Sequence, residues 1–245
     1  MSRRTRFAVF AVAVSGFGAL LVWGTAGLAD FGHYHGRLGL ILTKAPVKER
    51  QATNAVTAIV FDYRGLDTLG EEFILFAAVT GVALLLREAR EGMPEPADEV
   101  SSDTVRAVGI SLAACVLVLG IWVVAHGAIT PGGGFQGGVV VASAFLLLWL
   151  AGSLRSYRAV TPMWAVDFAE GLGAGAFVGA GLLALVLGQP FLHNLLPYGL
   201  AGKLSSGGSI PIVNWATALA VTAAFVLLFS EFLEERSLVL EERRK

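Results

Sequence analysis

Four acidic side chains that could do ion chemistry lie beside long apolar runs of the sequence: Asp67, Glu71, Asp167 and Glu170. Asp67 and Glu71 are four residues apart, and Asp167 and Glu170 are three apart, so each pair would share one face of a helix. Acidic residues at membrane depth often mark the routes of cations and protons. A second interpretation is purely structural, because the helix dipole favours carboxylates near a helix start. The residues alone leave both interpretations open.

Other kinds of chemistry find little support. We find no nucleophile beside a base, no Cys/His metal spacing, no phosphate loop and no dinucleotide fingerprint. The single cysteine, Cys115, lies within an apolar run. His33 and His35 would point the same way only in a strand, and a metal site there would need further ligands. We therefore expect no catalysis by this chain alone, no metal site and no cofactor.

The composition indicates a membrane protein. The chain is 55% hydrophobic and 15% charged, with a mean hydropathy of +0.69, whereas soluble domains are about 25% charged. The net charge of −1 and the absence of a basic groove interleaved with aromatic residues exclude nucleic acid as a partner. We expect an integral membrane protein whose surface contacts the lipid bilayer.

Six apolar runs are long enough to cross a membrane. The first, residues 7–28, would span about 33 Å as a helix. A cleaved signal peptide is the alternative there, suggested by Arg3 and Arg4, although the run exceeds the usual signal length. The others are 73–86 extended back to about Leu66, 108–125, 135–150, a span beginning near Trp164 with its apolar body at 171–187, and 215–232. The predicted fold is an all-α integral membrane protein with six transmembrane helices.

The spans divide into two plus four. Residues 87–107 carry mixed charge, and Pro94 and Pro96 would break a helix there. We therefore predict a two-helix region at 1–90, a linker at 91–105, a four-helix region at 106–236 and a charged tail at 237–245. With both termini inside, twelve of the 18 Lys and Arg residues lie on inner segments, which predicts cytoplasmic termini.

The stretch HGAITPGGGFQGG, residues 126–138, joins two of these spans. Glycine allows positive φ and close backbone approach, so five glycines in seven residues indicate a compact, closely packed crossing. A flexible hinge is the alternative, but Pro131, Phe135 and the apolar flanks are unlike the polar Gly/Ser tracts of flexible linkers.

A second irregular segment, PFLHNLLPYGLAGKLSSGGSIPIVN at 190–214, forms an extended outer loop. It is too apolar for free solution and too interrupted by Pro and Gly for one helix, so it should pack on protein. The residues of the two segments to which we assign a structural or interface role are Pro131, Gly132, Gly133, Gly134, Phe135, Gly137, Gly138, Asn194, Pro197, Gly207, Gly208, Pro211 and Asn214.

The fifth span is rich in glycine. Gly171, Gly175 and Gly179 follow a small-xxx-small spacing, which lets helix backbones approach closely. We expect this helix to be the central one of the bundle.

Two long motifs resemble known membrane proteins. HGAITPGGGFQGGVVVASAFLLL together with FLHNLLPYGLAGKLSSGGSIPIVN resembles the B subunit of multisubunit Mrp/Mnh-type sodium/proton antiporters. NAVTAIVFDYRGLDTLGEE resembles the C-terminal part of the large A subunit, which is similar to a small subunit of membrane-bound hydrogenases. The resemblance covers residues from about 25 to 235.

This resemblance implies a hetero-oligomeric complex of the cell membrane that exchanges sodium ions for protons, with other antiporter subunits as partners. It implicates Asp67 and Glu71 in ion movement and matches Glu170 to a glutamate early in the third B-type helix. Relatives often carry a glycine and an ionisable residue early in the last span, where this chain has Ala218 and Ala220.

Two functions follow as hypotheses. The first is a non-catalytic antiporter subunit that helps to line the cation route and to assemble the complex. The alternative is a structural coupling subunit of a membrane-bound hydrogenase or another redox complex related to complex I. No lysine lies within a span, and the acids stand near span starts, so we expect no ion exchange by this chain alone.

Overall fold

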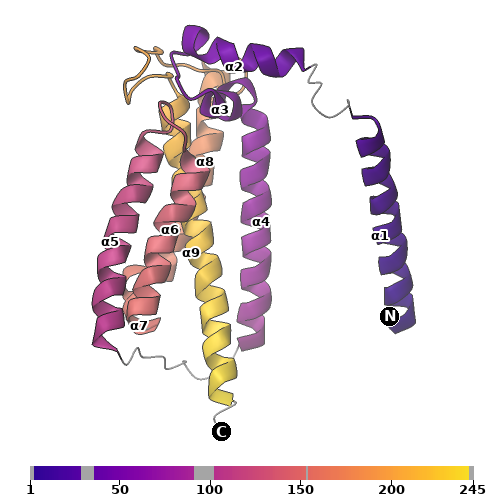
Figure 1. The fold of residues 1–245 in the computed structure, drawn as a ribbon, viewed down its shortest axis with the longest axis vertical. Coiled ribbons are helices and arrows are strands. Elements are labelled where there is room, and N and C mark those ends of the chain that lie inside the picture. Colours follow the sequence, from indigo (N-terminus) through magenta and orange to yellow (C-terminus); the bar gives the residue numbers. More distant parts are fainter. Residues whose placement is uncertain (1–2, 29–35, 91–101, 153, 243–245) are drawn as a thin grey trace. The chain divides into compact units, whose positions relative to one another are not determined.

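The computed structural model describes residues 3–28, 36–90, 102–152 and 154–242. Within these ranges the regular structure is helical, in the order α1, α2, α3, η1 and α4 to α9 (Figure 1). Six of the described helices are long and apolar enough to span a membrane, namely Phe7–Ala26, Gly65–Leu86, Asp103–Ala125, Gly134–Ala151, Met163–Val186 and Ile210–Leu233. The prediction of an all-α protein with six transmembrane helices is confirmed.

The chain forms two compact units, Met1–Ile41 and Leu42–Lys245. The first unit contains α1 (Arg3–Ala26), an apolar helix in which the Thr25 hydroxyl donates to the Leu21 carbonyl at 2.8 Å. His33 and His35 lie outside the described residues, as does most of the predicted linker at 91–105. The described part of the predicted tail continues the last helix as far as Glu242.

The second unit begins with short helices that lead into the second span. Helix α2 (Arg37–Glu49) extends into it, followed by α3 (Ala55–Ala58) and the π-helix η1 (Ile59–Tyr63). Asn54 caps α3, since its side-chain oxygen accepts from the backbone N–H groups of Val56 and Thr57. Helix α4 (Gly65–Arg90) starts directly after η1, close to the expected start near Leu66.

The remaining helices form an up-and-down bundle (Figure 1). They are α5 (Asp103–Ala125), α6 (Gly134–Ala151), the short α7 (Leu154–Val160), α8 (Met163–Val186) and α9 (Ile210–Glu242). Helices α4, α6 and α9 start at the end of the bundle that carries α3, here called the α3 end, whereas α5 and α8 start at the opposite end. Helices α4 and α8 are therefore antiparallel.

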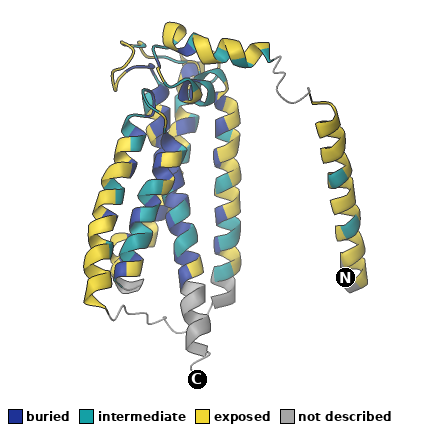
Figure 2. Ribbon diagram, in the orientation of Figure 1, coloured by how far each residue is buried: buried dark blue, intermediate teal, exposed yellow. Residues whose placement is uncertain are grey.

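The central helix is α9, and the expectation that the fifth span would be central is wrong. Helix α9 packs on α4, α6 and α8, and it is the most buried of the six spans (Figure 2). On α8, a Cβ added at Gly171, Gly175 or Gly179 would meet nothing within 4 Å. The close approach of α8 to α9 occurs instead at Gly173, where an added Cβ would lie 2.5 Å from the Ala220 backbone nitrogen, and the facing residues of α9, such as Ala220, are small and buried.

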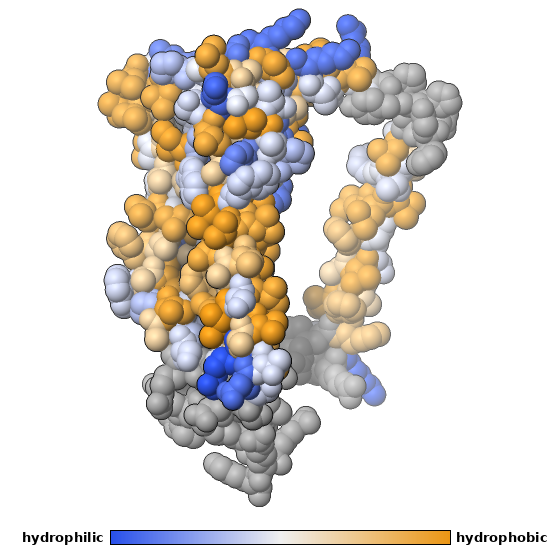
Figure 3. Space-filling view, turned by 60° about the vertical axis from the view of Figure 1, so that its left-hand side comes forward, coloured by the Kyte–Doolittle hydropathy of each residue, from blue (hydrophilic) through white to orange (hydrophobic). Residues whose placement is uncertain are grey.

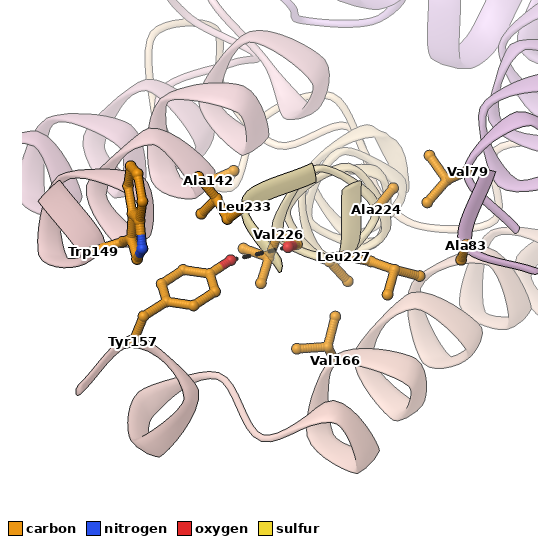
Figure 4. Packing of buried hydrophobic residues seen from close by; sticks show 11 residues of the cluster. Val79, Ala83, Ala142, Trp149, Tyr157, Val166, Ala224, Val226, Leu227 and Leu233 are labelled. Atoms are coloured by element: carbon orange, nitrogen blue, oxygen red, sulfur yellow. Dashed lines mark hydrogen bonds between the residues drawn. The ribbon is translucent and has the colours of Figure 1, made fainter. Parts of the chain in front are cut away.

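The apolar core surrounds α9 (Figure 4). Val79 and Ala83 approach from α4, and Ala142 and Trp149 from α6. The Tyr157 hydroxyl donates to the Val226 carbonyl at 2.9 Å, which satisfies a buried polar group at the α7 side of this core. Outside the core, hydrophobic residues cover much of the middle of the bundle face seen in Figure 3, as expected for a surface that faces lipid.

Candidate functional site

Two asparagines hold the glycine turn between α5 and α6. Asn214 of α9 accepts from the Gly134 N–H at 2.6 Å and donates to the Val124 carbonyl at 2.8 Å. Asn54 donates from its side-chain amide to the carbonyls of Gly127 and Thr130, both at 2.8 Å. The turn is thus fastened to α9 on one side and to the start of α3 on the other. These contacts favour a compact crossing over a flexible hinge.

Glycine is required in this turn for two separate structural reasons. Gly132 and Gly133 have φ of +145° and +141°, values that other residues rarely adopt. Gly134 and Gly138 allow α6 to approach α9, because an added Cβ would lie 2.5 Å from the Asn214 carbonyl oxygen and 2.9 Å from the Val221 Cβ, respectively. Of the other residues assigned here, Gly137 is buried, Phe135 is partly buried and Pro131 is exposed.

Asn194 fastens the outer loop. Its amide donates to the Asp62 carboxylate and to the Gly207 carbonyl, both at 2.9 Å, and its oxygen accepts from the Ser209 N–H at 2.7 Å. Gly207 and Gly208 turn the chain with φ of +94° and +65°. Pro197 is exposed, and Pro211 lies in the first turn of α9, where proline is tolerated. The loop therefore packs on protein through a polar network.

A charged group, Arg50, joins this network to η1. The Arg50 guanidinium donates to Asp62 at 2.8 Å and lies over the rings of Tyr63 and Tyr198. Burial lowers the pKa of Arg50, but the hydrogen bond and charge of Asp62 outweigh it, so this pKa is raised above its ordinary value. Burial and the hydrogen bond to Glu49 raise the pKa of Tyr63 to about 12. Both groups keep their usual protonation states at neutral pH.

A cavity of about 420 Å³ opens beside this network. Asp62, Asp67, His193 and Tyr198 are among its lining residues. Asp67, one of the predicted ion-pathway residues, thus lies at a polar opening at the α3 end. Its carboxylate is exposed and forms an ion pair with Arg64.

The other three predicted acids occupy different surroundings. Glu71 and Asp167 are exposed on α4 and α8, whereas Glu170 is buried with 5% of its surface exposed. The structure therefore separates the exposed group of Asp67, Glu71 and Asp167 from the buried Glu170.

Glu72 is a buried acidic residue that the sequence interpretation passed over, as is Glu231 of α9. Glu72 is 5% exposed, as Glu170 is, and these two residues line one small cavity between α4, α8 and α9. The rest of the lining consists of Leu75, Phe76, Ala174, Ala220, Val221 and Ala224. Glu72 lies on one buried stripe of α4 with Thr68, Val79 and Ala83, and the apolar residues on the other faces of this helix hide the stripe in the sequence.

Each glutamate lies near the start of its own helix, but the cavity that both line lies farther inside the bundle. Each is the eighth residue of its helix, about 10 Å from the helix start. Because α4 and α8 start at opposite ends, the two side chains converge between those ends. Ala220 and Ala224, on the α9 side of the cavity, lie about 15 and 21 Å from the start of that helix, near the middle of its 24-residue span. The sequence placed these acids near span starts, and in the structure both line a cavity that lies beside the middle of the α9 span.

No group of three or more His, Cys, Asp or Glu side chains in the described ranges is placed to hold a metal ion. The chemistry that the site offers is that of carboxylates: Asp67 and Glu71 toward the α3 end, Glu72 and Glu170 near the middle, and Asp167 toward the opposite end.

Comparison with known proteins identifies the larger part of the bundle. Residues 104–227, which run from the second residue of α5 through α8 to the middle of α9, match the family model described as a domain related to the MnhB subunit of Na+/H+ antiporter. An uncharacterized protein of Methanocaldococcus jannaschii is 30% identical over 222 residues, covering 78% of this chain and 82% of that protein. The B subunit of a Na+/H+ antiporter from Bacillus subtilis is 34% identical over 85 residues, covering 34% of this chain and 57% of that protein.

A solved structure extends the likeness beyond the matched domain. One chain in the structure of the membrane-bound sulfane sulfur reductase, an archaeal respiratory membrane complex, is 32% identical with a TM-score of 0.74. The match covers 95% of this chain and 99% of that one, so it includes α4 as well as the domain at 104–227. Together, the family model that matches half of the sequence and the relatives that match most of it place the chain in the family of proteins related to the MnhB subunit of Na+/H+ antiporters.

Proposed function

We propose that this chain is a non-catalytic membrane subunit of a multisubunit monovalent cation (sodium)/proton antiporter, in which it helps to line the cation route and to assemble the complex. Its partners are the other antiporter subunits. The membership of the MnhB-related family supports this proposal, and so does the name of the Bacillus relative, which is the B subunit of a Na+/H+ antiporter.

The observation that carries the proposal is the distribution of acidic residues along α4 and α8. Asp67, Glu71 and Glu72 descend from the α3 end along α4, and Asp167 and Glu170 rise from the opposite end along α8. A cation needs compensating charge inside the bilayer, because an uncompensated charge at its centre costs about 2.5–3.5 kcal/mol on insertion scales. Acids distributed from one end of the bundle to the other supply such compensation along the membrane normal.

The polar network at the α3 end supports the assembly role. The glycine turn and the outer loop are held in fixed positions by Asn54, Asn194 and Asn214, so this end can present a defined surface to neighbouring subunits. We further propose that the protein resides in the cell membrane with both termini cytoplasmic, which places this end outside. The division into regions 1–90 and 106–236 remains part of the proposal.

One observation favours the alternative function, a structural coupling subunit in a redox complex. The matched chain of the sulfane sulfur reductase structure corresponds to this one over nearly its whole length. Under this alternative the chain purifies with redox subunits. Purification from native membranes separates the two functions: antiporter subunits alone support the first, and iron–sulfur or hydrogenase-like subunits support the second.

The proposal predicts how Asp67→Asn and Glu71→Gln behave in the assembled complex. If the two carboxylates line the route, each neutral variant lowers sodium-dependent proton exchange severalfold while the amount of complex stays normal. If they only stabilise the start of α4, each change costs about 0.3–1 kcal/mol of helix stability and leaves exchange nearly intact. The measurement is exchange per assembled complex in vesicles at several sodium concentrations.

Asp103→Asn is the matched control, because it removes an exposed carboxylate from the first turn of α5. None of the acidic residues that we assign to the cation route lies on this helix. The control should exchange as the wild type does. Wild-type exchange in both Asp67→Asn and Glu71→Gln at every sodium concentration would mean that these two acids are structural.

A further inference from the structure

The cavity between α4, α8 and α9 contains carboxylates that lack partners. Neither carboxylate oxygen of Glu72 has a hydrogen-bond partner among the described residues, and the same holds for Oε1 of Glu170. Both side chains are 5% exposed and line the cavity. Buried polar atoms are almost always hydrogen-bonded, so several unpartnered oxygens at one place indicate that something else binds there.

The charge of the surroundings indicates which kind of ligand the cavity suits. In the part of the chain that the structure describes, no Lys, Arg or His lines the cavity, and the other lining residues are apolar. The nearest further ionisable groups on the two acidic helices are Glu71 on α4 and Asp167 on α8, which are both exposed carboxylates. The described side chains that α9 contributes to the lining are alanine and valine, without a titratable group. Two bare carboxylates in such a place would be very costly, so the ligand has to bring positive charge.

The size and the donor atoms narrow the ligand further. The space open to the centre of a water molecule is about 10 Å³, which is close to the least that one water needs. Two carboxylates supply four oxygen ligands. The fully buried Thr217 hydroxyl lies close to the Glu72 carboxylate and interacts with it, although the two groups lack the geometry of a full hydrogen bond. Magnesium keeps several waters and calcium takes six to eight ligands, so both demand more room. A bare alkali cation or a proton fits these limits.

We propose that Glu72 and Glu170 together form a binding site for one dehydrated alkali cation, for which a proton competes. The inference rests on the proposed function and names a position on its cation route. Either ligand cancels part of the negative charge of the pair, so binding of one weakens binding of the other. Such exclusion at a single site is what an exchanger requires.

The test is carbodiimide labelling of the assembled complex in its membranes, followed by mass spectrometry of the two glutamates. Dicyclohexylcarbodiimide reacts with protonated carboxyl groups in apolar surroundings. We expect Glu72 or Glu170 to be labelled in choline chloride, and the labelling to fall at least fivefold when NaCl or KCl replaces choline chloride at the same concentration and pH. In Glu72→Gln, labelling of Glu170 should no longer depend on the alkali cation.

Asp103→Asn is the control, since it removes an exposed carboxylate from the first turn of α5, away from α4 and α8, and should keep the cation protection. Recovery of each variant with its partner subunits verifies folding. The proposal is overturned if neither glutamate is labelled, or if the labelling is the same with and without every alkali cation. It is also overturned if alkali cations still protect Glu170 from labelling in Glu72→Gln. If alkali cations protect the wild-type glutamates from labelling but complexes with Glu72→Gln or Glu170→Gln exchange ions normally, the cation-binding site is supported and its position on the proposed cation route is wrong.

Discussion

Glu72→Gln and Glu170→Gln should each reduce cation-dependent proton exchange by the assembled complex on the order of a hundredfold. A cation that passes the middle of the bilayer without its countercharge meets an added barrier of about 3 kcal/mol, and each 1.36 kcal/mol lowers a rate about tenfold. Glutamine preserves the shape of glutamate and removes the charge from a place where it lacks partners among the described residues. The amount of folded complex should therefore stay normal or increase.

The measurement is exchange per assembled complex, with partner subunits quantified after purification. Asp103→Asn again serves as the control for a carboxylate lost elsewhere. If both buried glutamates can be neutralised with less than a twofold effect on exchange, the cavity is not on the ion route.

Gly134→Val should prevent the folded chain from accumulating. The new Cβ would lie 2.5 Å from the Asn214 carbonyl oxygen and 2.8 Å from the Thr217 Cβ, so α6 would have to move away from α9. Overpacking costs about 1–3 kcal/mol, and separating the Gly134 N–H from Asn214 leaves buried polar groups unpaired at a further cost of about 1–3 kcal/mol. The assay is the monodisperse fraction of solubilised protein after heating, together with co-purification of partners.

Gly175→Val provides the comparison, because an added Cβ at Gly175 of α8 meets nothing within 4 Å. Both changes introduce the same β-branched residue into a transmembrane helix. Gly175→Val should leave the monodisperse fraction nearly unchanged. Equal damage from both variants, or none from either, would contradict the close α6–α9 contact as the reason for glycine at position 134.

Run length was sufficient to predict the six spans, because crossing the bilayer demands about 20 apolar residues whatever the partners. The helix ends were less predictable. The third span begins at Asp103 and the last at Ile210, both earlier than the apolar runs indicate. Polar capping by Ser102 and the proline in the first turn of α9 extend these helices beyond their apolar cores.

The central helix and the buried glutamate could not be predicted in the same way. In a membrane helix apolar residues face lipid as well as protein, so hydrophobic periodicity does not distinguish the buried stripe. The glycine spacing of α8 therefore suggested a central helix, whereas the actual contact is formed by Gly173 of α8 and the alanines of α9. Glu71 and Glu72 are neighbours in sequence, but successive residues of a helix point in directions about 100° apart, and the packing of α4 buries Glu72.

The depth of the glutamate pair depends on helix direction, which is a tertiary property. Each glutamate alone lies near the start of its span, and only the antiparallel arrangement of α4 and α8 brings both to one cavity. The glycine turn, in contrast, was recognisable from residues 126–138 themselves, because so many glycines between apolar spans are typical of a tight, closely packed crossing.

The most direct test of the central claim, that this chain is a non-catalytic antiporter subunit, is the sodium-dependent collapse of a pH gradient in everted membrane vesicles. Three kinds of vesicles are compared: those with the complete set of subunits, those with the set lacking this chain, and those with this chain alone. We expect collapse with the complete set, its loss when this chain is omitted, and none with this chain alone. Robust exchange by the chain alone, or full exchange by the set without it, would contradict the account.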